Sequence, residues 1–133
     1  MKLDVWHDAV ELNTVVHDVL HQGAVEMKIR GQLADAAQSV ASNIAEGYSR
    51  RSVNEYIQHL YVALGSLSEV LTRCICLKET GQMAQAQFDR IDSVHYAVEN
   101  RLWRLVRSLQ EKRTTGAWVD TIAGAESSRV PKE

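Results

Sequence analysis

Two histidines in the first quarter of the chain have the spacing of a metal-binding pair. His17 and His21 are four residues apart in the stretch VVHDVLHQ, and on a helix this spacing places both imidazoles side by side on one face. Zinc sites usually take three or four protein ligands. His7 lies ten residues before His17, about 15 Å along a helix, and no further ligand continues the pattern. The sequence therefore predicts no metal and no other cofactor, and a metal-binding bundle stays open as an alternative.

The stretch ASNIAEGYSRRS, residues 41–52, gathers polar side chains where one predicted helix ends and the next begins. On a helical wheel the polar positions of this segment fall opposite its apolar positions, so we expect them to face away from the core of the protomer. Three interpretations stay open: a solvated surface, a polar subunit interface, and a contact with a small ligand or RNA. The residues concerned are Ser42, Asn43 and Glu46, together with Ser39 just before the stretch.

Four arginines form a candidate site for an anionic partner such as RNA. Arg50 and Arg51 follow the second predicted helix, and Arg104 and Arg107 lie near the end of the fourth, where residues 99–113 carry five basic and two acidic side chains. In an antiparallel bundle these two segments share one end. The alternative is that the basic residues complement the helix dipole and form ion pairs.

The remaining composition excludes several classes of protein. No nucleophile elbow and no phosphate-binding glycine loop occurs, so we predict no enzyme. Fifteen Lys and Arg against 17 Asp and Glu give a net charge of −2, unlike a dedicated nucleic-acid binder. No apolar run approaches the ~18 residues of a membrane span, and the N-terminal stretch is interrupted by acidic residues where a signal peptide is apolar. We expect a cytoplasmic protein without a membrane partner.

Helical periodicity runs through almost the whole chain and predicts four helices, at about residues 3–22, 29–46, 52–80 and 84–112. Between them, Gly47 and Gly81 suit the left-handed residue that closes a helix, and Ser52 suits an N-cap. Short links favour an all-α, up-down-up-down antiparallel bundle over residues 1–113. The predicted core seams are Val5, Ala9, Leu12, Val16 and Val19; Leu33, Ala37, Val40 and Ile44; Tyr56, Leu60, Ala63, Leu67, Val70, Cys74 and Leu77; and Phe88, Ile91, His95, Val98, Leu102, Leu105 and Leu109.

The third predicted helix carries a second apolar stripe beside its seam, with Tyr61 at its border. The combined apolar arc is wider than the ~100° that a surface helix needs. Two interpretations stay open: a very well buried helix, or a helix that packs partly against a neighbouring subunit. The stripe consists of Ile57, Leu64, Leu71 and Ile75.

The last segment, residues 114–133, contains two glycines, paired serines and the single proline. This composition is typical of a loose tail. Trp118, Val119 and Ile122 could instead dock on the bundle as a short apolar patch.

Three motifs occur in order along the chain: LDVWHDAVEL near the start, SNIAEGYSRRS in the middle and EYIQHLYVALGSLSE directly after it. Together, over about residues 3–111, they resemble the four-helix-bundle proteins of the 23S ribosomal RNA intervening-sequence protein family. The resemblance implies a protomer that assembles as a ring-shaped homopentamer. A related branch comprises accessory proteins of diversity-generating retroelements, which bind nucleic acid and a reverse transcriptase. No catalytic residues are implied, so a scaffold or interaction module with an RNA or nucleoprotein partner is expected.

Overall fold

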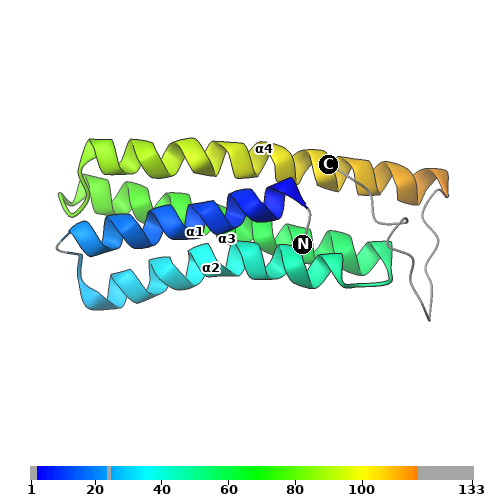
Figure 1. Ribbon diagram of the computed structural model, residues 1–133, viewed down its shortest axis with the longest axis horizontal. Helices are drawn as coiled ribbons and strands as arrows, with labels where there is room; N and C mark the ends of the chain where they lie inside the picture. Colours follow the sequence, from blue (N-terminus) through cyan, green and yellow to red (C-terminus); the bar gives the residue numbers. More distant parts are fainter. Residues whose placement is uncertain (1–2, 24, 117–133) are drawn as a thin grey trace.

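Four helices make up the fold. The computed structural model describes residues 3–23 and 25–116, in which α1 spans Asp4–Gln22, α2 Met27–Tyr48, α3 Val53–Glu79 and α4 Gln85–Thr115. Within those residues there is no strand. Figure 1 shows the four helices side by side, with successive helices running in opposite directions. The predicted all-α fold of four helices is confirmed.

The helices are arranged as the four corners of a square. α1 packs on α2 and α4, and α3 packs on the same two helices. α1 and α3 therefore face each other across one diagonal, and α2 and α4 across the other. α1 is the shortest helix, and in Figure 1 it begins well short of the end at which α2 joins α3. That end of the bundle is consequently built from α2, α3 and α4.

The predicted seams form the core. Every seam position is buried except Phe88, which is half-buried at the start of α4. His95 is the one polar member of the core among the described residues, and it is 4% exposed. Its Nε2–H donates to the carbonyl oxygen of Leu67 on α3 at 3.1 Å. This bond meets the requirement that a buried polar group be hydrogen-bonded, as the sequence predicts for a core histidine.

Gly47 does not close α2 in the left-handed conformation, so that prediction is wrong. The helix continues to Tyr48, and only Gly81 and Gly116 have a positive φ among the described residues. A Cβ atom on Gly47 would lie 2.9 Å from Cδ1 of Tyr56 and 3.0 Å from Cβ of His59. Glycine is needed here because α2 and α3 approach each other closely, just before the link between them.

The other predicted helix boundaries agree well with the structure. The Ser52 hydroxyl accepts a hydrogen bond from the Glu55 N–H at 3.4 Å, and Gly81 follows α3 with φ of 78°. α4 continues to Thr115 and closes at Gly116, whose N–H donates to the Lys112 carbonyl. Trp118, Val119 and Ile122, the candidates for a docked patch, lie outside the described residues.

α3 has the most apolar composition of the four helices. It is the one described helix long and apolar enough, by length and composition, to cross a membrane. Ten of its residues are nevertheless buried in the bundle. Polar residues interrupt the apolar ones throughout α3, so the helix contains no apolar run approaching ~18 residues. Composition alone does not distinguish a membrane span from the core helix of a bundle.

Candidate functional site

The polar residues predicted on the outer side of α2 form a hydrogen-bonded layer against α3. The Oγ atoms of Ser39 and Ser66 lie 2.8 Å apart. Asn43 donates from Nδ2 to the carbonyl oxygen and the Oγ of Ser39, at 2.9 and 3.0 Å. His59 Nδ1 lies 3.4 Å from Asn43 Oδ1. These contacts hold α2 and α3 together through polar side chains.

The expectation that Ser39 and Asn43 face away from the protomer is therefore wrong. Both are half-buried and contact α3. A helix at the corner of a square bundle touches two neighbours, so its inner arc is wider than the single seam used for the prediction. Whether either residue also lies near a subunit interface stays a prediction.

Glu46 is exposed, and it is paired within its own helix end. Its Oε2 lies 2.9 Å from Nη2 of Arg50, four residues later. An exposed pair of this kind contributes less than about 1 kcal/mol. Arg50 is thus already engaged with a carboxylate, which weakens its candidacy as a phosphate contact.

The structure brings the four candidate arginines to the same half of the bundle, with Arg50 and Arg51 in the α2–α3 link and Arg104 and Arg107 on α4. Arg113 on α4 donates to Asn54 Oδ1 on α3 at 3.0 Å, so the end of α4 does lie beside the α2–α3 link. Arg104 is exposed and lies about 200° round α4 from the buried Leu102, because each residue turns the helix by ~100°.

Three of these arginines have free guanidinium groups. Within the described part of the chain, the side chains of Arg51, Arg104 and Arg107 form no hydrogen bond or ion pair, and all three residues are exposed. Arg101, one turn before Arg104, differs because it pairs with Asp4 and Asp8 of α1 at 3.3 and 3.2 Å. The outer side of α4 therefore presents two unpaired cations.

Exposed apolar side chains concentrate on α3 and α4. These two helices carry five of the seven large hydrophobic residues that are exposed in the described chain. Tyr61 and Trp103, each 40% exposed, meet edge to face with ring centroids 6.5 Å apart. Gln110 donates to the Tyr61 hydroxyl at 2.7 Å. The five residues are Tyr61, Val62, Ile75, Tyr96 and Trp103.

The second stripe predicted on α3 divides between the core and the surface. Ile57 and Leu64 are 2% and 8% exposed, so these two side chains belong to the core and are not free to meet a neighbour. Leu71 is half-buried, and Ile75 is exposed. The surface part of the stripe is therefore the part that could contact another subunit.

Sequence reasoning missed the contribution of α4 to this surface. Tyr96 and Trp103 are seven residues apart and lie on one side of the helix. Trp103 directly follows the core residue Leu102. A wheel drawn for α4 as well as for α3 would have found both.

A groove of about 610 Å³ runs along the outer side of α3 toward the start of α2. Small residues line it, and nothing lies within 4 Å of the position that a Cβ on Gly65 would occupy. Arg73, at its edge, is held by Glu69 at 2.8 Å and by Gln32 at 2.9 Å. The groove thus leaves the backbone of α3 accessible from outside the protomer.

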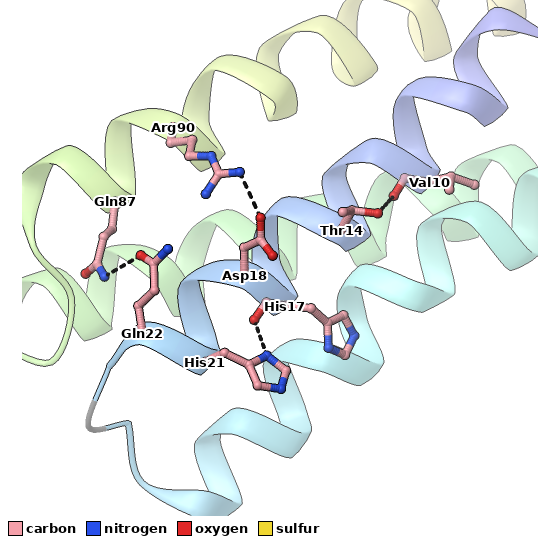
Figure 2. Close-up of polar contacts among 8 residues, drawn as sticks. All are labelled: Val10, Thr14, His17, Asp18, His21, Gln22, Gln87 and Arg90. Carbon is pink, nitrogen blue, oxygen red and sulfur yellow. Dashed lines mark hydrogen bonds and ion pairs between the residues drawn. The ribbon is translucent and has the colours of Figure 1, made fainter.

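The two histidines of α1 lie at the opposite corner of the bundle. Both are exposed, and their ring centroids are 6.5 Å apart. Figure 2 shows them on one side of α1, whereas Asp18 and Gln22 reach toward α4. The Nδ1 of His21 lies 2.7 Å from the carbonyl oxygen of His17. No group of three or more His, Cys, Asp and Glu side chains among the described residues is placed to hold a metal ion.

The two cysteines differ in environment although only one residue separates them. Cys74 is buried in the core and Cys76 is exposed, and both are free thiols. Burial raises the pKa of the Cys74 thiol from 9.0 to about 12. Cys74 therefore stays protonated near neutral pH and is not a nucleophile.

Comparison with known proteins identifies the family. A family model described as 23S rRNA-intervening sequence protein matches residues 1–104, which include α1, α2, α3 and most of α4. No curated protein matches the chain. Because the match extends over well more than half of the sequence, the chain belongs to the 23S rRNA-intervening sequence protein family.

Proposed function

We propose that the protein is a non-catalytic scaffold that assembles with copies of itself through the outer surface of α3 and α4. The observation that carries this proposal is the concentration of exposed apolar side chains on those two helices. Monomeric soluble proteins rarely leave a large contiguous apolar surface in contact with water. The proposal places the protein in the cytoplasm, with its own chain as its first partner.

Most of the exposed apolar side chains of this surface lie on α4 or on the side of α3 that faces α4, whereas Val62 lies about 100° round α3 from Tyr61. Tyr61 and Trp103 are in ring contact, and Tyr96 comes next to His95, which bonds to Leu67. Tyr96 of α4 therefore lies at the level of Leu67, roughly midway between the levels of Tyr61 and Ile75 on α3. These side chains extend over both helices and fit a partner that packs along the bundle.

Small residues on α3 support close packing against another copy. Gly65 has open space around it, and Ser68 and Thr72 line the groove beside it. Fully burying one large apolar side chain contributes about 1.5–3 kcal/mol, so a few such side chains can hold an assembly together. A ring-shaped homopentamer is the proposed form, which requires that two different surfaces of the protomer meet.

Light scattering on the untagged protein at micromolar concentration tests the assembly. We expect a single species with about five times the 14.9 kDa mass of one chain. A species with the mass of one chain over the whole concentration range would contradict the proposal. A smaller closed oligomer would retain the scaffold but overturn the pentamer.

RNA binding is the second candidate function, and the unpaired arginines of α4 favour it. Arg104 and Arg107 are exposed cations without a partner in the described chain, and the family description refers to 23S rRNA. In a ring, the pair would be repeated by each copy. Clustered cations that neutralise phosphates bind RNA with a strong dependence on salt.

Retention of ribosomal RNA fragments across a salt series tests this second function. We expect the double substitution Arg104→Gln/Arg107→Gln to flatten the salt slope by roughly 1.4 units per contacting protomer, since each phosphate contributes about 0.7 on single strands. Arg90→Gln is the matched control, because Arg90 is already paired with Asp18. An unchanged slope in the double variant would leave these arginines without a role in binding.

A further inference from the structure

We infer that His17 and His21 form a two-histidine site on α1 for a borderline divalent ion such as Zn²⁺, Ni²⁺ or Cu²⁺, with water completing the coordination. The site is separate from the proposed assembly surface, because α3 is at the opposite corner of the bundle and the two histidines lie on the side of α1 away from α4 (Figure 2). Its ligands are two imidazoles spaced to lie on one helix face.

The hydrogen bond of His21 leaves one nitrogen of its ring ready to bind a metal. A carbonyl oxygen can only accept, so the contact with the His17 carbonyl at 2.7 Å places a proton on Nδ1 of His21. In the neutral imidazole the lone pair is then on Nε2. Metal-binding histidines commonly donate their other ring N–H to a carbonyl or carboxylate in this manner, which fixes the ring and its tautomer.

The two rings are within reach of a common ion. Each metal–nitrogen bond is about 2.0–2.1 Å long, so two nitrogens on one ion lie no more than about 4 Å apart. The ring centroids are 6.5 Å apart and the rings are inclined by 35°. Both side chains are exposed, so a rotation about the His17 side-chain bonds closes this gap without moving the backbone.

Contacts on the other side of α1 hold the helix that carries the two rings. Arg90 of α4 pairs with Asp18 at 3.0 Å, and Gln87 of α4 donates to Gln22 at 3.4 Å (Figure 2). The last two turns of α1 are thereby tied to α4, so the helix backbone holds residues 17 and 21 one turn apart before an ion arrives. An unfolded chain lacks that spacing, so the ion binds the folded protein more tightly.

The ligand set also selects the class of ion. Imidazole nitrogens suit Zn²⁺, Ni²⁺ and Cu²⁺, whereas Mg²⁺ requires oxygen ligands. The nearest carboxylate along the helix, Asp18, is engaged by Arg90 on the side that faces α4. With two protein ligands, the ion retains open positions for water and exchanges readily.

Calorimetric titration of the untagged full chain with Ni²⁺ at fixed pH tests the site. We expect saturation at one ion per chain and no saturable binding of Mg²⁺. His17→Gln and His21→Gln should each weaken Ni²⁺ binding at least tenfold, because one imidazole alone forms no chelate. His7→Gln should leave the affinity unchanged, since His7 has no second histidine within one turn.

A variant with the same number of histidines distinguishes binding at this pair from nonspecific binding of metal by histidines anywhere in the chain. The double substitution His21→Gln/Gln22→His moves one imidazole by a single position, which turns it off the shared face. We expect this variant to bind Ni²⁺ as weakly as His21→Gln, and Ni²⁺ to raise the melting temperature of the native protein but not of the variant. Equal affinity of the native chain and this variant, or the absence of saturable binding, would overturn the site.

Discussion

The half of the bundle formed by α1 and α2 differs from the half formed by α3 and α4 in what it shows to solvent. Both halves supply apolar seams to one core. On the outside, α1 and α2 expose one large hydrophobic residue each, Val10 and Met27, whereas α3 and α4 expose five. The interior is shared, whereas the exteriors differ, and this difference is the basis of our proposal that the protein assembles through the outer surface of α3 and α4.

The comparison is also visible within α3 itself. Its inner side fills the core with residues such as Leu60 and Leu67. Its outer side carries the exposed Val62 and Gly65, and nothing lies within 4 Å of the position that a Cβ on Gly65 would occupy. Substitutions on the two sides should therefore change different properties: stability from the inside, and assembly from the outside.

Core substitutions should have the largest effect on stability. Leu67→Ala and Leu102→Ala remove side chains that are 1% and 0% exposed, and we expect each to lower the free energy of unfolding by about 2–5 kcal/mol through the cavity it leaves. Chemical denaturation provides the measurement. Losses below about 1 kcal/mol at both positions would contradict the assignment of these residues to the core.

Two glycines inside helices sharpen the comparison between the inside and the outside. Gly47→Ala should destabilise by about 1–3 kcal/mol, because the new Cβ would meet Tyr56 and His59. Gly65→Ala should instead stabilise the protomer by up to ~1 kcal/mol, since alanine favours helix and the site is open. Thermal unfolding of the two variants shows whether each substitution raises or lowers the melting temperature. If both variants shift the melting temperature equally and in the same direction, α2 and α3 do not approach each other closely at Gly47.

The cap of α3 should have a smaller effect. Ser52→Ala removes the acceptor for the Glu55 N–H, and a lost N-cap costs about 1 kcal/mol. The same denaturation experiment measures it, with Ser52→Asp as the control that restores an acceptor. If the aspartate variant is as unstable as the alanine variant, the hydroxyl does not act as a cap.

The reactivity of the two cysteines distinguishes the inner from the outer side of α3, and this experiment requires little change in stability. In a dilute folded sample a thiol reagent should label one cysteine per chain, Cys76, and label Cys74 only after unfolding. The raised pKa of the buried thiol slows its reaction further, because the thiolate is the nucleophile. If the folded Cys76→Ser variant is still labelled at one cysteine per chain, this assignment is wrong.

Most of the fold could be predicted from the sequence, because seam residues such as Leu33, Leu67 and Leu102 repeat at the helical period. His95 could also be placed in the core, since it occupies a seam position. Gly47 was misinterpreted because a helix-closing glycine and a close-packed glycine look alike in a sequence. Distinguishing them requires knowledge of Tyr56 on the next helix.

The candidate site was less predictable, because it depends on which neighbour each side of a helix meets. Ser39 and Asn43 are outside the seam of α2, but they face α3 rather than solvent. Arg50 lies in the link between α2 and α3, whereas Arg104 lies within α4, nine residues before the Arg113 that contacts Asn54. Periodicity gives positions around one helix axis, whereas these outcomes require the placement of neighbouring helices.

The most direct test of the central claim compares two exposed valines, one on each half of the bundle. Val62 on α3 and Val10 on α1 are 52% and 38% exposed, so glutamate at either position should leave the protomer folded, which circular dichroism verifies. We predict by light scattering that Val62→Glu reduces the assembly to the 14.9 kDa mass of one chain, whereas Val10→Glu retains the native mass. Retention of the assembly in Val62→Glu, or equal loss in both variants, would contradict an interaction surface on α3 and α4.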